Sequence, residues 1–86
     1  MGSVSMTYAV LNGPQGQLVD VPVDRVEIAR DGVGVRLVDE ERGISVFVPL
    51  VGSSPFLFEH ERREPYPKDG SMSLDEVRRR IRDARG

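Results

Sequence analysis

The chain has 86 residues, of which 38% are hydrophobic and 30% are charged, and its formal net charge is −2. A chain of this length forms one small domain, and no apolar run approaches the ~20 residues that a membrane-spanning helix needs, so we expect no contact with a membrane. There is no cysteine, which excludes thiol catalysis and favours the reducing cytoplasm.

The N-terminal region predicts a hairpin. Residues 1–5 carry no recognisable element, and we expect a disordered tail or a vector-derived remnant there. Two β-prone runs follow, at residues 6–11 and 17–23, separated by turn-forming Asn, Gly, Pro and Gln residues. Pro22 cannot donate a hydrogen bond to a neighbouring strand, so the second run is expected to lie at a sheet edge or to end there.

The clearest pattern is a β-meander over residues 26–50. Asp31 and Gly32 predict a two-residue hairpin turn with positive φ at both positions. The register that follows pairs four residues of each strand: Val26 with Leu37, Glu27 with Arg36, Ile28 with Val35 and Arg30 with Val33.

A second turn over residues 40–43 ends at Gly43, which suits the left-handed conformation. It places Leu37 opposite Val46 and Val35 opposite Val48. The two turns together put eight aliphatic residues on one face of the sheet, which we expect to be buried: Val26, Ile28, Val33, Val35, Leu37, Val46, Val48 and Leu50. A slip of one residue in the register would scatter this set.

The C-terminal part predicts a short strand at residues 56–59 and then a helix. Ser73 and Glu76 form a capping-box pattern at the start of the helix. Two ion pairs are expected along it, Asp75 with Arg79 and Glu76 with Arg80. An apolar stripe recurs at helical spacing: Leu74, Val77, Ile81 and Ala84. So short a helix is marginal alone, and we expect the stripe to dock on its own sheet or on a second subunit.

These elements predict a mainly β fold, with five or six antiparallel strands in a small curled sheet or a barrel of SH3-like size, and one C-terminal helix. The alternative is a two-layer α+β sheet with the helix across one face. The expected segments are the tail (1–5), the β domain (6–62), a Pro/Gly linker (63–73) and the basic C-terminal helix (74–86).

The residues that support catalysis or metal binding are few and isolated. His60 is the single histidine and there is no cysteine, so a transition-metal site lacks ligands, and we expect His60 at the surface. Glu40 and Glu41 lie at a predicted turn, where solvent keeps carboxylates from being tuned for acid–base chemistry. Ser53 and Ser54 are not part of a nucleophile elbow. We expect no enzyme activity, no cofactor and no metal.

Two surfaces remain as binding candidates. The face of the meander opposite the core carries Arg36, Val38 and Phe47, with Phe47 across from Arg36 and within reach of a cation–π contact. Phe and Arg are enriched at protein interfaces, so these three residues are expected either to bind a partner or to be covered by the helix or residues 56–58.

The second surface is the arginine-rich helix. Arg78, Arg79 and Arg82 are candidates for contact with phosphate groups or with an acidic partner, although acids within the same helix offset part of their charge. The leading hypothesis is a non-catalytic interaction or regulatory module in the cytoplasm that binds another protein or itself, as a homodimer. The alternative is a nucleic-acid-binding accessory protein that uses this helix.

Overall fold

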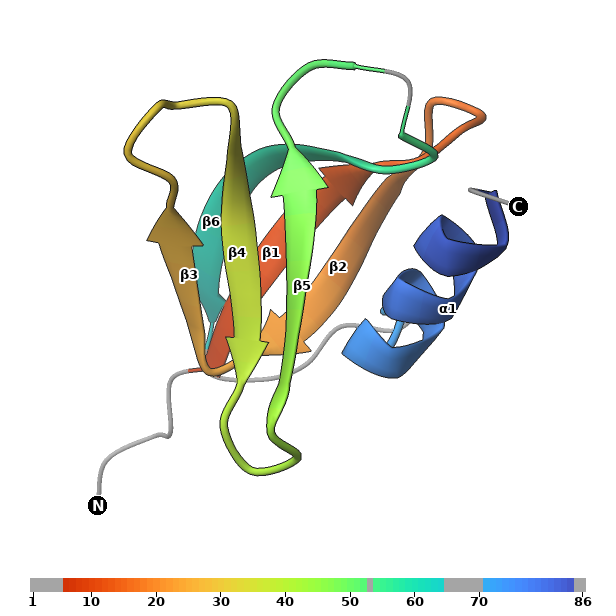
Figure 1. The fold of residues 1–86 in the computed structure, drawn as a ribbon. Coiled ribbons are helices and arrows are strands. Elements are labelled where there is room, and N and C mark those ends of the chain that lie inside the picture. Colours follow the sequence, from red (N-terminus) through yellow and green to blue (C-terminus); the bar gives the residue numbers. More distant parts are fainter. Residues whose placement is uncertain (1–5, 53, 65–70, 85–86) are drawn as a thin grey trace.

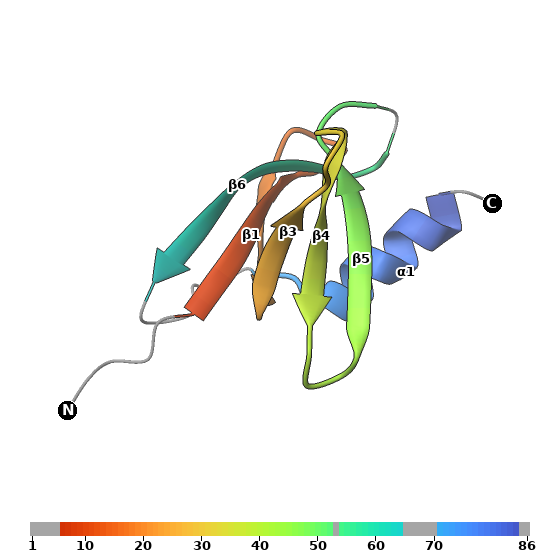
Figure 2. The same cartoon turned by 60° about the vertical axis from the view of Figure 1, so that its left-hand side comes forward.

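The computed structural model describes residues 6–52, 54–64 and 71–84. In these residues the elements are β1 (Met6–Asn12), β2 (Leu18–Val23), β3 (Arg25–Ile28), β4 (Gly34–Asp39), β5 (Ile44–Pro49), β6 (Leu57–Glu64) and α1 (Leu74–Ala84). The strands form two antiparallel sheets, sheet A in the order β2-β1-β6 and sheet B in the order β3-β4-β5. The predicted mainly β fold with a C-terminal helix is confirmed, and Figures 1 and 2 show its strands as two facing sheets with α1 beside them.

The predicted N-terminal hairpin is formed by β1 and β2. The N–H of Gly13 donates to the carbonyl of Gln17 at 2.8 Å and closes the turn. β2 is an edge strand of sheet A, as Pro22 predicted. Its alternate residues are all buried: Val19, Val21 and Val23. One face of this hairpin therefore supplies one side of the core.

Sheet B has the predicted register. Glu27 pairs with Arg36, and Ile28 pairs with Val35. Across the next hairpin Val35 pairs with Val48, and Gly43 closes the second turn with a positive φ of 68°. Both turns keep the aliphatic residues of the meander on one side.

The conformation of the first turn in sheet B differs from the prediction. Gly32 has a positive φ of 70°, but no non-glycine residue in the described part of the chain does, Asp31 included. The N–H of Gly32 donates to the carbonyl of Ala29 at 3.0 Å, and the Asp31 carboxylate accepts a hydrogen bond from the N–H of Val33 at 3.3 Å. This wider loop needs only one left-handed residue, and glycine takes that position without steric strain.

The inner face of sheet B is buried only in part. Its fully covered members lie on β4 and β5: Val35, Leu37, Val46 and Val48. The predicted burial of Ile28, Val33 and Leu50 is wrong, because these residues are 75%, 52% and 36% exposed. They lie on the edge strand β3 or near the β3–β4 turn. The alternation of side chains places them on the same face as the core residues, but neither sheet A nor α1 covers them there.

The predicted sixth strand is present as β6 and continues to Glu64. Its pairing with β1 shifts between Val10 and Leu11, which marks a β-bulge. Of the segments proposed from the sequence, the tail (1–5) and residues 65–70 of the linker lie outside the described residues.

The start of α1 is capped by Ser73, whose hydroxyl oxygen accepts a hydrogen bond from the N–H of Glu76 at 3.2 Å. The other half of the predicted capping box is not formed. The Glu76 carboxylate instead accepts hydrogen bonds from Arg79 and Arg80, at 2.6–2.7 Å. Hydrogen bonds from charged donors are stronger than one from a backbone amide. The bonds from Arg80 and then Arg79 lower the pKa of Glu76 below its ordinary value of 4.5.

The helix docks within its own chain. Leu74 and Val77 are buried and Ile81 is partly buried against the core. The predicted pair of Asp75 with Arg79 is not formed, because the Asp75 carboxylate binds the Arg42 guanidinium in the β4–β5 turn at 2.6 Å. Figure 1 shows α1 beside β2 and β5, so the helix covers the side of the molecule where these two edge strands meet.

The core lies between the two sheets and extends to the helix. Its buried members are Ala9, Leu11, Val19, Val21, Val23, Val35, Leu37, Val46, Val48, Phe56, Leu74 and Val77. In the described part of the chain no polar or charged residue is buried. Hydrophobic burial therefore supplies the main stabilisation of this small domain.

Candidate interaction site

The structure brings the three partner-binding candidates of the meander together on the outer face of sheet B. Phe47 on β5 is the direct cross-strand neighbour of Arg36 on β4, and Val38 is two residues further along β4. Arg36 is exposed and Phe47 is 49% exposed, whereas Val38 is half-buried. The outer face is therefore accessible around Phe47 and Arg36, and α1 does not cover it.

Phe47 also has a structural contact that the sequence did not reveal. Its ring lies over Gly34, the residue diagonal to it on β4. A Cβ at Gly34 would collide with the ring and would come 2.7 Å from the carbonyl oxygen of Val48. Gly34 therefore leaves room for the end of the Phe47 ring beside β4, while the side chain as a whole stays 49% exposed.

The expected cation–π contact of Arg36 with Phe47 is not formed. The Arg36 guanidinium lies 3.4 Å from the Glu27 carboxylate, which Arg25 also binds at 2.7 Å. The hydrogen bond from Arg25 is the main reason that the pKa of Glu27 lies below its usual value. In the described residues the cation–π contact is made instead by Arg62, whose guanidinium carbon is 5.7 Å from the centroid of the Tyr8 ring.

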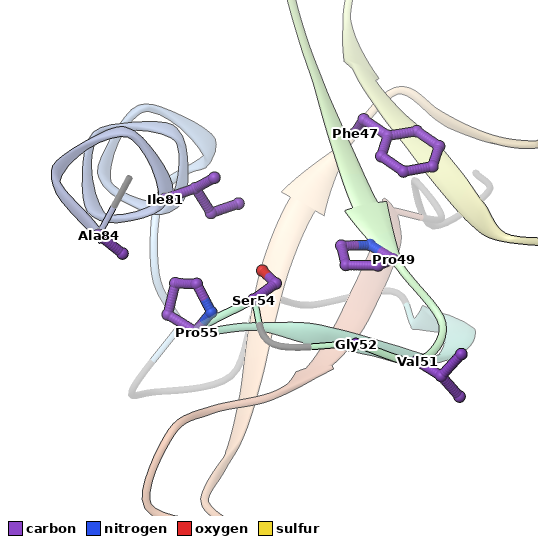
Figure 3. A pocket seen from close by; sticks show the side chains of 8 residues that line it. All are labelled: Phe47, Pro49, Val51, Gly52, Ser54, Pro55, Ile81 and Ala84. Carbon is purple, nitrogen blue, oxygen red and sulfur yellow. The ribbon is translucent and has the colours of Figure 1, made fainter. Parts of the chain in front are cut away.

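A groove lined mostly by apolar side chains lies between β5, the β5–β6 loop and the second half of α1 (Figure 3). Its volume is about 390 Å³, and its lining residues are Phe47, Pro49, Val51, Gly52, Ser54, Pro55, Ile81 and Ala84. Figure 3 shows Ile81 and Pro55 facing Pro49 and Phe47 across the groove. The sequence pointed to Phe47 and to the end of the helix stripe, but not to the loop that joins them.

The three arginines proposed for phosphate or acidic-partner contact are all exposed on α1, but they are not equivalent. Arg79 binds Glu76 through two hydrogen bonds, at 2.6 and 2.7 Å, and these bonds raise the pKa of Arg79. Arg78 and Arg82 make no ion pair with any described residue. They are therefore the two cations of the helix that are available to a partner.

Arg78 and Arg82 lie close together on α1 but are not among the residues that line the groove. At about 100° per residue, Asp75, Arg78 and Arg82 lie along one side of α1 in successive turns. Asp75 contacts Arg42 in the β4–β5 turn, so this side of the helix faces sheet B. On the same geometry Arg78 is about 60° around the helix from the groove-lining Ile81, whereas Arg82 is about 160° from Ala84, so of the two only Arg78 lies next to a residue of the groove.

A second polar cluster joins all three strands of sheet A. Arg62 on β6 forms an ion pair with Asp20 on β2, above Tyr8 of the central strand β1. Tyr8 is fully buried, and both charged side chains are half-buried. Neither the spacing nor the composition of the sequence signals this cluster, because its members are brought together only by strand pairing. It ties the sheet together across its outer face.

Three polar residues that the sequence analysis considered for catalysis or metal binding lie at the surface. His60 is exposed on β6, and Glu40 and Glu41 are exposed in the β4–β5 turn, as predicted. Over residues 6–52, 54–64 and 71–84, no group of three or more His, Cys, Asp or Glu residues is placed to hold a metal ion. Within the same ranges, no helix is long and apolar enough to cross a bilayer.

No known protein family, curated protein or solved structure matches the chain. Function is therefore inferred from the groove, the exposed arginines of α1 and the outer face of sheet B alone.

Proposed function

We propose that the chain is a non-catalytic interaction module that binds a segment of another protein in the groove between α1 and β5. The observation that carries this proposal is the composition of the groove. A half-exposed aromatic ring, two prolines and the outer end of the helix stripe line one concavity. Apolar concavities with a few polar groups at the border are typical of binding sites. We also propose a cytoplasmic location, which the absence of cysteine favours, and a regulatory role.

The proposed partner segment has an apolar side chain next to acidic residues. The groove volume of about 390 Å³ is enough for one large side chain with its neighbours, rather than for a whole helix. Arg78 and Arg82 lack carboxylate partners in the described part of the chain, and complementary charge on the ligand would satisfy them. Charge at the rim of a site mainly favours encounter and selects partners, whereas the buried anchor supplies affinity.

Nucleic-acid binding by α1 is the weaker alternative. Glu76 forms ion pairs with Arg79 and Arg80, so Arg78 and Arg82 remain for phosphate contacts. Two such contacts contribute a salt slope of only about −2 and little affinity at physiological salt. The acidic net charge of −2 also opposes approach to a polyanion.

The proposal is tested with two synthetic peptides titrated into ¹⁵N-labelled protein. Both have one central tryptophan, flanked by glutamates in the first and by serines in the second. We expect the acidic peptide to shift the amide resonances of Phe47, Ile81 and Ala84 and to bind at least about tenfold more tightly than the neutral one, which corresponds to about 1.4 kcal/mol. Raising the salt concentration should reduce this difference.

Two matched variants locate the binding. Ala84→Gln fills the groove and should abolish the shifts, whereas Asp83→Gln changes the neighbouring residue, which does not line the groove, and should leave them intact. If neither peptide binds and a single-stranded DNA oligonucleotide shifts Arg78 and Arg82 instead, the nucleic-acid alternative replaces the proposal.

A further inference from the structure

The four edge strands of the two sheets differ in how they are protected. β2 and β5 have α1 beside them (Figure 1). β6 has a β-bulge and charged residues along its length, two devices that prevent an edge from pairing with another chain. Among the described residues, β3 has neither a bulge in its pairing with β4 nor a covering helix. It is the edge that is most open to a further strand.

The backbone of β3 presents hydrogen-bonding groups on its open side. The N–H of Ala29 donates to the carbonyl of Gly34 on β4 at 3.0 Å, so Ala29 faces β4. In an antiparallel strand alternate residues face opposite neighbours. Glu27 therefore also faces β4, whereas the N–H and C=O groups of Val26 and Ile28 point away from it.

When two copies of β3 are paired in antiparallel orientation, opposite charges on the two strands can face each other. Arg25 and Glu27 flank Val26 and lie on the same face of the strand. If Val26 lies opposite Val26 of a second copy, each Arg25 is opposite a Glu27. The outward-pointing backbone groups of Val26 then form two hydrogen bonds across the two-fold axis. The corresponding arrangement on β6, centred between Glu61 and Arg63, would instead place Arg62 against Arg62.

The apolar residues at this edge fit the same arrangement. Ile28 is 75% exposed and Val33 is 52% exposed, both on the core side of sheet B. In the Val26-centred register Ile28 lies diagonally across from Val26 of the second copy. Pairing would therefore cover an aliphatic side chain that is exposed in the single chain.

We propose that the chain forms a two-fold dimer through antiparallel pairing of β3 with β3 of a second copy, which joins two copies of sheet B into one six-stranded sheet. This interface is separate from the groove and does not depend on the proposed function. Because β3 has only four residues, the interface is small, and the dimer is expected to dissociate on dilution.

The test is a charge exchange across the two-fold axis, followed by sedimentation velocity over a range of concentrations. Wild-type protein should show a concentration-dependent dimer. Arg25→Glu and Glu27→Arg should each place like charges opposite one another and weaken dimerisation at least about tenfold. Mixing the two variants should restore a dimer, because the two acidic side chains on β3 of the first variant then face the two arginines on β3 of the second.

Matched changes on the other free edge strand serve as controls. Glu61 and Arg63 form the same kind of pair on β6, with a distance of 3.1 Å, and Arg63→Glu or Glu61→Arg should leave the dimer unchanged. Circular dichroism establishes that each variant is folded. A wild-type chain that stays monomeric at the highest soluble concentration contradicts the proposal, as does a mixture of the two β3 variants that stays monomeric.

Discussion

Two neighbouring residues of sheet B show how differently its parts are used. Ile28 and Val35 are directly paired and point to the same side of the sheet, yet Val35 is 1% exposed and Ile28 is 75% exposed. Val35 lies on the central strand, opposite sheet A, whereas Ile28 lies on the free edge strand. Two apolar residues on the same face of the sheet can therefore differ completely in burial. The part of the sheet that no second layer covers is available for contacts with other molecules.

Truncation in the buried part should have the largest effect. Leu37 is fully buried among core residues of both sheets and the helix. We expect Leu37→Ala to lower the free energy of unfolding by about 2–5 kcal/mol, because the change removes buried apolar atoms and leaves a cavity. Chemical denaturation monitored by circular dichroism measures this loss. A loss below about 1 kcal/mol would show that the two sheets do not enclose this residue.

Lowering the pH should reduce stability through carboxylates at the surface and not through the core. The described core contains no carboxyl or imidazole group, whereas Glu27 on β3 and Glu76 on α1 have pKa values lowered by hydrogen bonds from arginines. A carboxyl group with a lowered pKa stabilises the folded state fully above its unfolded pKa, here about 4.5, and this contribution disappears as the pH falls through the folded value.

We therefore expect a small loss of stability below about pH 4.5, which is the ordinary value for these groups. Both side chains are partly open to solvent, and screening by water keeps the effect small. Glu27→Gln and Glu76→Gln together should flatten this part of the stability profile, with thermal melting as the measurement. A steep loss that persists in the double variant would require a titrating group elsewhere.

Truncation at the exposed edge should have the smallest effect. Ile28→Ala should change the free energy of unfolding by no more than about 0.5 kcal/mol when measured on dilute, monomeric protein, because little buried area is lost. The same denaturation experiment provides the comparison with Leu37→Ala. Equal losses at the two positions would mean that a second layer covers β3.

Most of the fold could be predicted because local signals agreed. Gly32 and Gly43 indicated where the two turns lie, and the spacing of the valines between them was compatible with a single pairing register of the strands. The serine before α1 and the stripe that begins at Leu74 fixed the helix. These signals each depend on residues that are close in the sequence, where backbone preferences act directly.

The extent of burial and most of the candidate site could not be predicted in this way. Whether Ile28 is covered depends on the size of the opposing sheet, and no residue near it encodes that size. The groove depends on how the β5–β6 loop brings Pro55 toward Ile81, and the Arg62–Asp20 pair depends on strand order. Phe47 was recognised because an aromatic residue on a mixed face is a local signal.

Native-state hydrogen exchange of the amides in sheet B tests the central claim, that the covered part holds the fold while the β3 edge remains open for pairing. At low concentration the amide of Glu27, which faces β4, and the amide of Val35 should be protected, whereas the amides of Val26 and Ile28 should exchange rapidly. At high concentration the Val26 amide should become protected, and the other protected amides should not change. Rapid exchange of Val26 at every concentration, or equal protection of Val26 and Glu27 in the dilute monomer, would contradict the account.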